Sequence, residues 1–252
     1  MSKWFVCLLI FFCLGMKPGI AAQEDSPVTL PETIVIEAAD GTQLYASYYA
    51  QPADAAPEGG YPAVLLLHPI NMDRTAWQRV IEPLFAEGFV LLAVDRRGNG
   101  ETTGSSDSLA DVDDVAVWLA WLKSQPGIGK TAVGGASLGA NIALAGCAEN
   151  SDCVTAIVIS PIVSADTPER LDILTGLTAM SRGLRPMLFL VTYGEAGGAI
   201  SEDVRLAISQ VNGIMTLRVY RGDAHATDLF RTTSGESAIH LIVDWLHEYL
   251  DA

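Results

Sequence analysis

Basic side chains are scarce in this chain. Its 252 residues include 15 lysines and arginines against 30 aspartates and glutamates, which gives a formal charge of −15. A nucleic-acid-binding protein needs clustered Lys and Arg to neutralise phosphates, so this balance argues against a nucleic-acid partner. A solvated acidic surface that keeps the protein soluble explains the charge and identifies no substrate. The oligomeric state stays open.

Long apolar runs are also rare, and one of them lies near the N-terminus of the chain. A short basic start, Met1–Lys3, precedes an apolar stretch from Trp4 to Met16, and Gly19–Ala22 offers a small-residue cleavage site. The stretch is too short to span a bilayer. We expect residues 1–22 to be a signal peptide and residues 23–252 a single domain, periplasmic or secreted, with no membrane attachment after processing. A retained anchor is the alternative.

Cysteine is sparse as well. Of the four cysteines, Cys7 and Cys13 lie in the predicted signal peptide, so the mature chain would keep Cys147 and Cys153. These two flank a short polar turn, which makes a disulfide sterically plausible in an oxidising compartment. Two unrelated reduced thiols are the alternative, and a metal site is disfavoured because no histidine lies nearby. We therefore expect a structural disulfide and neither a metal nor another cofactor.

Apolar segments of strand length alternate with helical patterns along most of the chain. Thr33–Ala38 and Leu44–Tyr49 flank a turn at residues 40–42 and predict an antiparallel hairpin at the edge of a sheet. This βα alternation with continuous apolar strands predicts a mostly parallel sheet of about eight strands, covered by helices on both faces. The later strands are expected at 64–67, 90–94, 131–134, 154–160, 187–192 and 215–220, and helices near 74–86, 109–123, 169–181, 201–211 and 234–250 and from residue 137.

A glycine-flanked serine stands between one of these strands and the next helix, in Gly135-Ala136-Ser137-Leu138-Gly139. A serine at such a sharp turn has a strained backbone, and a Cβ at either flanking position would collide with neighbouring backbone. The pattern predicts a nucleophile elbow with Ser137 as the nucleophile. A small-residue turn that closes an ordinary strand–helix pair is the alternative.

Four histidines compete for the role of general base. His225 stands in a loop after the last predicted strand, whereas His68 ends a buried strand and is expected to form structural hydrogen bonds. His240 and His247 fall on the solvated face of the last helix. Histidine titrates near neutral pH. We expect His225 to take the Ser137 proton and return it to the leaving group.

The carboxylate that orients His225 has two candidates. Glu195 follows the strand predicted at 187–192 and is favoured, and Asp166, after the preceding strand, is the alternative. Asp223 and Asp228 are closer to the histidine in sequence, but they are expected to serve the loop turn and the start of the last helix.

The elbow and the order serine, acid, histidine resemble the α/β-hydrolase family. The resemblance covers most of the mature chain and favours lid-poor members related to dienelactone hydrolases and small esterases. Val64–His68 resembles the family's third strand with its His-Gly turn, and Val90–Glu101 its fourth strand with an Asp-x-Arg-Gly-x-Gly loop, which is expected to be structural. Pro69 stands where the family usually has glycine, and Tyr193–Gly198 lacks the usual aspartate.

An oxyanion hole needs two N–H donors. Leu138, directly after the serine, is expected to supply one at the N-terminus of its helix. The second should come from the loop after His68. Because Pro69 has no N–H, this donor is expected at Ile70, with the Asn71 side chain as a substitute.

The segment between Ser160 and Pro186 is where larger relatives insert a lid. It is about 25 residues long here, so the site should be open, and small soluble esters, thioesters, lactones or short amides are favoured over long-chain lipids. The sequence therefore predicts an exported, carboxylesterase-like serine hydrolase that forms a covalent acyl-enzyme with a small acyl substrate. A catalytically degenerate binding or scaffold protein and a peptidase of the same fold are the alternatives.

Overall fold

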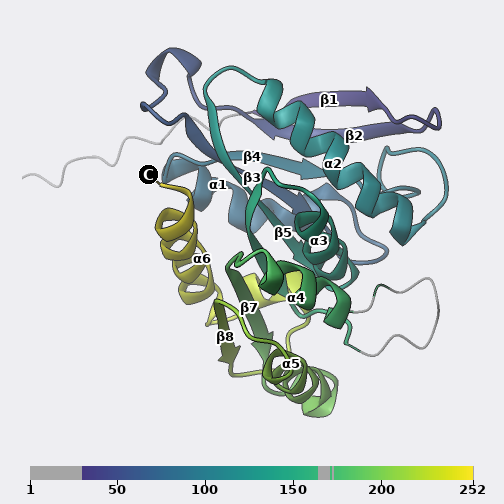
Figure 1. Cartoon of the computed structure of the whole chain (residues 1–252), viewed down its shortest axis with the longest axis vertical. Coiled ribbons are helices and arrows are strands. Elements are labelled where there is room, and N and C mark those ends of the chain that lie inside the picture. The colour runs from purple at the N-terminus through teal and green to yellow at the C-terminus, as the bar shows by residue number, and fades with distance from the viewer. Residues whose placement is uncertain (1–29, 164–170, 172, 252) are drawn as a thin grey trace, which may run out of the picture.

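Eight strands form one twisted sheet, with the order β1-β2-β4-β3-β5-β6-β7-β8 (Figure 1). The computed structural model describes residues 30–163, 171 and 173–251. β2 pairs antiparallel with β1 and with β4, and the remaining pairs are parallel. The predicted mostly parallel sheet with an N-terminal hairpin at its edge is therefore confirmed. The strands are β1 (Glu32–Glu37), β2 (Gln43–Tyr49), β3 (Tyr61–Leu67), β4 (Val90–Val94), β5 (Ile128–Ala136), β6 (Cys153–Ile159), β7 (Met187–Thr192) and β8 (Met215–Tyr220).

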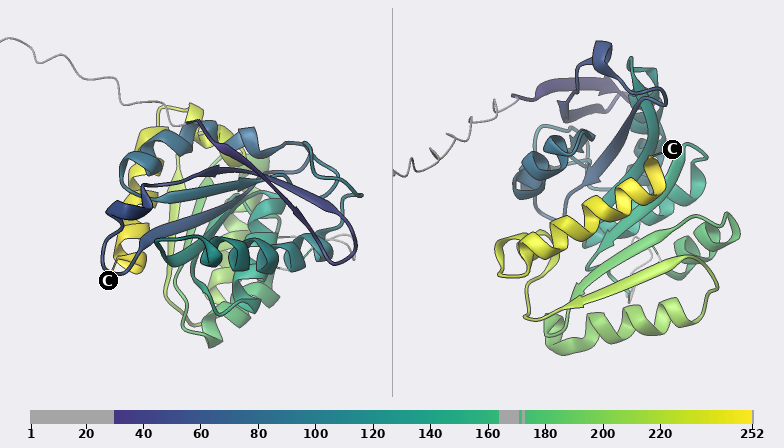
Figure 2. Two further views of the ribbon diagram at one scale, coloured as in Figure 1. Left: turned by 90° about the horizontal axis from the view of Figure 1, so that it is seen from above. Right: turned by 90° about the vertical axis from the view of Figure 1, so that its left-hand side faces the viewer.

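Helices cover both faces of the sheet, as predicted. α1 (Gln78–Ala86) and α6 (Gly235–Leu250) pack on one face. The other face carries α2 (Ser108–Ser124), α3 (Leu138–Glu149), α4 (Ile173–Arg182) and α5 (Ala199–Ser209). Figures 1 and 2 show the hairpin at one end of this assembly and β8 with α5 at the other. None of the helices within the described residues is long and apolar enough to cross a membrane.

Strand side chains alternate between the two faces. In β3, Ala63, Leu65 and Leu67 join the cluster beneath α2 and α3. Val64 and Leu66 join the cluster beneath α1 and α6. Because both faces are buried, these strands appear in the sequence as unbroken apolar runs rather than as alternating patterns.

Several element ends differ from the predictions. β5 begins at Ile128 because Tyr61 already pairs with it there, before an irregularity in the ladder. The helix expected near 74–86 is a 3₁₀ turn (Arg74–Trp77) followed by α1, and the Asp73 side chain accepts the Thr75 N–H where the turn begins. The predicted signal peptide lies outside the described residues.

The carboxyl ends of β3 to β8 lie along one edge of the sheet, because these strands run parallel. Ser137 directly follows β5, Glu195 lies shortly after β7, and His225 follows β8. In open α/β sheets this edge forms the crevice where ligands bind. The topology therefore gathers the predicted site residues at one end of the molecule.

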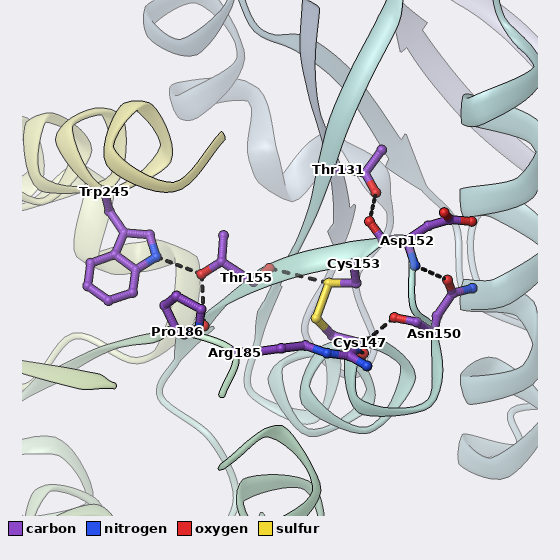
Figure 3. Close-up of a disulfide and its surroundings, with 9 residues drawn as sticks. All are labelled: Thr131, Cys147, Asn150, Asp152, Cys153, Thr155, Arg185, Pro186 and Trp245. Atoms are coloured by element: carbon purple, nitrogen blue, oxygen red, sulfur yellow. Dashed lines mark hydrogen bonds between the residues drawn. A yellow bond between two sulfur atoms is a disulfide. The ribbon is translucent and has the colours of Figure 1, made fainter. Parts of the chain in front are cut away.

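A disulfide ties the end of α3 to the start of β6 (Figure 3). Cys147 and Cys153 have Cα atoms 5.2 Å apart, and both side chains are buried. The Arg185 guanidinium donates to the carbonyls of Cys147 and of Asn150, the latter at 2.7 Å. A cation at this position adds a donor to the carbonyls at the helix end and complements the helix dipole.

The loop after β4 is fixed by buried ion pairs to α2. Arg96 Nη1 lies 3.1 Å from the Asp111 carboxylate, and Arg97 makes two hydrogen bonds to Asp114, at 2.7 and 2.8 Å. Burial raises the pKa of Asp111 to about 6 although Arg96 opposes this change. The loop has the structural contacts expected from the sequence.

His68 connects this loop to the one that follows β3. The Arg96 backbone N–H donates to His68 Nε2 at 2.9 Å, so Nδ1 carries the proton and donates to the Pro69 carbonyl at 2.7 Å. Arg96 also donates through Nε to the His68 carbonyl at 3.1 Å and through Nη2 to the Pro69 carbonyl at 3.3 Å. The ring is fully buried, so a second proton would break a hydrogen bond that has no solvent replacement.

Replacing both Cys147 and Cys153 with serine should lower stability without affecting chemistry. The short loop that they close gives a chain-entropy contribution of about 2–3 kcal/mol at most. Differential scanning calorimetry should show a melting temperature lower by several degrees, and turnover at room temperature should be unchanged. Two titratable thiols in the unfolded, unreduced wild-type protein would contradict the disulfide.

The His68→Gln substitution should reduce the loss of stability in acid. Burial, together with the nearby Arg96 guanidinium, lowers the pKa of His68 to about 4, whereas an unfolded histidine titrates near 6.5. The unfolded chain therefore gains this proton first, and stability that is complete above pH 6.5 declines as pH falls toward 4.

Urea denaturation of the wild-type protein and the variant at pH 7.5 and pH 5 isolates the His68 contribution, because the other titrating groups, among them Asp111 with its raised pKa, are present in both proteins. The glutamine variant should lose about 2 kcal/mol less over that interval. Equal pH dependence in the two proteins would show that His68 does not titrate in this way.

Candidate active site

Ser137 occupies a strained turn that depends on its two flanking glycines. Its φ and ψ are 55° and −123°. A Cβ on Gly135 would lie 2.0 Å from the Gly139 carbonyl oxygen, and a Cβ on Gly139 would lie 2.4 Å from that of Leu67. Both distances are far below van der Waals contact, so the predicted need for glycine at these positions is confirmed.

His225 contacts both Ser137 and Glu195. Its Nε2 lies 2.9 Å from Ser137 Oγ, and its Nδ1 is hydrogen-bonded to Glu195 Oε1. Because the carboxylate accepts from Nδ1, Nε2 is left to accept the serine hydroxyl. The imidazole side chain is 46% exposed, whereas that of Glu195 is 2% exposed. The structure thus brings together the three side chains singled out in the sequence, with the histidine open to solvent.

Hydrogen bonds between the ends of β7 and β8 and the loops that follow them hold Glu195 near His225. Two join backbone groups and one comes from the Thr192 side chain. The contacts are Tyr193 N to Tyr220 O at 2.8 Å, Gly194 N to Gly222 O at 2.7 Å, and Thr192 Oγ1 to Ala224 O at 2.9 Å. These hydrogen bonds extend the pairing of the two strands up to the site.

Ser160, which the sequence analysis treated only as the end of a strand, joins this group. It follows β6, and its hydroxyl donates to Glu195 Oε2 at 2.9 Å and accepts the Ala226 N–H at 3.1 Å. Its side chain is buried. Its one signal in the sequence was a polar residue at the carboxyl end of a largely apolar strand, which does not indicate its partners.

Strained backbone gathers around these side chains. Positive φ angles occur at Ser137, at Ser160 (47°), at Ala226 (55°) and at Ala196 (48°), beside Glu195. Residues that are not glycine adopt such angles at a cost, and they persist where surrounding contacts enforce them. Such a concentration of strain is typical of functional sites.

The loop after β3 leaves the Ile70 backbone N–H free of the groups that hold the Pro69 carbonyl. The Pro69 carbonyl is held by His68 and Arg96, and the described residues contain no cis peptide bond. In a trans peptide the N–H of the next residue points opposite to the carbonyl, so the Ile70 N–H faces away from these two side chains. Leu138 begins α3, and Gly139 lies close to the Leu67 and His68 carbonyls, so the start of α3 packs against the end of β3.

The remaining candidates lie elsewhere. His240 is exposed, as expected, but His247 is only partly exposed because its ring packs against Phe89 with centroids 4.8 Å apart. Asp228 is exposed and lies 3.9 Å from Arg231 in the turn that follows His225. Asp166, the alternative acid, is outside the residues that the structure describes.

This arrangement can supply a hydroxyl nucleophile, a base to accept its proton, and amides to bind a developing oxyanion. Within the described part of the chain, no three His, Cys, Asp or Glu side chains converge where a metal ion could be held.

Solved structures with this fold include an esterase and a thioesterase domain. The esterase Pf2001 of Pyrococcus furiosus is 20% identical, with a TM-score of 0.71 over 87% of this chain and 90% of its own. Est1E of Butyrivibrio proteoclasticus, solved with ferulic acid bound, is 15% identical, with a TM-score of 0.69 over 86% and 98%. The thioesterase domain from the curacin biosynthetic pathway is 14% identical, with a TM-score of 0.61 over 86% and 99%. At these identities the matches establish the fold alone.

A search of the curated proteins gave no significant match. The sequence model of the alpha/beta hydrolase family matches residues 64–245, which span the strands from β3 through β8 and all three residues of the Ser137–His225–Glu195 group. The protein belongs to the alpha/beta hydrolase family.

Proposed function

We propose that this protein is a serine hydrolase that cleaves small carboxylic esters, thioesters or lactones through a covalent acyl-enzyme. The observation that carries the proposal is the 2.9 Å contact between Ser137 Oγ and His225 Nε2, with Glu195 bonded to the other ring nitrogen. Serine is a weak nucleophile on its own and needs an adjacent, oriented base of this kind.

The chemistry proceeds in two halves. Ser137 Oγ attacks the acyl carbon while His225 takes the hydroxyl proton, and the new oxyanion is bound by the N–H groups of Leu138 and Ile70. The bond from the acyl carbon to the leaving group then breaks, and His225 returns the proton to the departing oxygen or sulfur. Water repeats the sequence on the acyl-enzyme, which releases the carboxylic acid and restores Ser137.

Small substrates suit the openness of the site. The histidine is nearly half exposed, and between β6 and β7 the described chain contains one helix, α4. The fold neighbours described as esterases and as a thioesterase act on the same bond class. We place the protein in the periplasm or outside the cell, on the basis of its N-terminal sequence and its disulfide.

A panel of p-nitrophenyl esters of graded acyl length, with a chromogenic peptide as control, tests the proposal. We expect turnover of the short esters, little turnover of long ones or of the peptide, and none in Ser137→Ala. Preferential peptide cleavage would indicate a peptidase of the same fold. A folded protein that hydrolyses none of these compounds would favour the binding or scaffold alternative.

The Glu195→Gln substitution should keep the fold and lower turnover of a short p-nitrophenyl ester by at least about a hundredfold. An amide cannot stabilise the imidazolium that forms during attack, and it can favour the wrong tautomer of His225. Asp166→Asn is the matched control and should change the rate little. If the aspartate variant lost activity and the glutamate variant kept it, Asp166 would be the acid.

Ile70→Pro should lower turnover by about a hundredfold or more, equivalent to about 3 kcal/mol of transition-state stabilisation, because it removes one oxyanion donor. Ile70→Ala keeps the N–H and should have a small effect. Steady-state kinetics should place the loss in kcat more than in KM, with circular dichroism as the folding control. Near-normal turnover in folded Ile70→Pro would show that the second oxyanion donor is a different group. Asn71→Ala would then test whether that group is the asparagine side chain.

A further inference from the structure

We propose that Ser160 is a positioning residue of this site, which holds the Glu195 carboxylate in the orientation that His225 requires. The inference rests on the proposed function. Ser160 lies at the end of β6, between the strand that precedes Ser137 and the strand that precedes Glu195. Its hydroxyl therefore reaches the network from the strand between the nucleophile and the acid.

A glutamate at this position needs a second anchor. Its side chain has one more rotatable bond than the aspartate that the family resemblance leads one to expect, and its terminal torsion is broad. The carboxylate is buried, so an oxygen without a partner would be costly. His225 Nδ1 bonds Oε1, and Ser160 Oγ donates to Oε2 at 2.9 Å, so each oxygen has a donor and the carboxylate plane is fixed.

The serine hydroxyl is itself directed by the loop that carries the histidine. The Ala226 N–H donates to Ser160 Oγ at 3.1 Å, which occupies a lone pair and leaves the hydroxyl proton for Glu195. The Ser160 backbone is held by its N–H bond to the Leu190 carbonyl at 2.9 Å. The Ser160 hydroxyl thus contacts Glu195 directly. It is linked to His225 through the backbone N–H of Ala226, the residue that follows the histidine in the chain.

Two variants distinguish the effect of losing the Ser160 hydroxyl from the effect of relieving the strained backbone at this position. Ser160→Ala and Ser160→Gly both lack the hydroxyl, but glycine also relieves the positive φ of 47°. If the hydroxyl positions Glu195, both should lower kcat for a short p-nitrophenyl ester by about 10–100-fold with KM nearly unchanged. The reaction of Ser137 with a fluorophosphonate should slow by a similar factor.

Ser181→Ala is the matched control. This α4 serine also has a buried hydroxyl, but that hydroxyl has no hydrogen-bond partner among the described residues, and its loss should leave kcat unchanged. Melting temperatures of all three variants should be measured alongside, so that a loss of folded protein is not counted as a loss of rate.

A proton NMR spectrum tests the positioning directly and without substrate. The His225 Nδ1–H bonded to Glu195 should give a low-field resonance in the wild-type protein, which moves upfield or broadens by exchange in both Ser160 variants and stays in place in Ser181→Ala. If wild type hydrolyses no ester, the proposed function fails while this spectrum still tests Ser160. Unchanged kcat and an unchanged resonance in both variants, or restoration of both by glycine alone, would overturn the inference.

Discussion

The close approach of α3 to the end of β3 is the constraint on which the rest of the site depends. Gly139 lies so near the Leu67 and His68 carbonyls that no other residue fits, and this contact forces the chain into the turn that presents Ser137. The same contact brings the first amide of α3 against the loop after β3. One backbone contact therefore positions Ser137 and the loop that carries the proposed second oxyanion donor.

Buried ionic and polar contacts behind the carboxyl ends of the strands stabilise the site. The loops after β3 and β4 are joined through His68 and Arg96, and Arg96 is paired in turn with Asp111 on α2. On the other side, the buried Glu195 carboxylate is bonded by Ser160 and His225. A buried charge that loses its partner is strongly destabilising, so these groups hold the strained backbone that the site contains.

Local patterns made much of this predictable. The glycine-flanked serine, the unbroken apolar strands and the position of His225 after the last strand are each readable in short windows, and together they predicted the sheet and which side chains meet. Glu195 was preferred over Asp166 because it follows the strand after which the family resemblance places the acid. Ser160 was not predicted because its partners lie in the loops after β7 and β8, far away in sequence. No local sequence pattern indicates such contacts.

The central claim is that Ser137 is an activated nucleophile. Incubating the folded protein with a fluorophosphonate probe, followed by intact-mass and peptide mass spectrometry, tests it most directly. The account predicts a single adduct on Ser137, absent from Ser137→Ala and from heat-denatured wild type. A folded wild-type protein that acquires no adduct, or an adduct on a different residue, would contradict it.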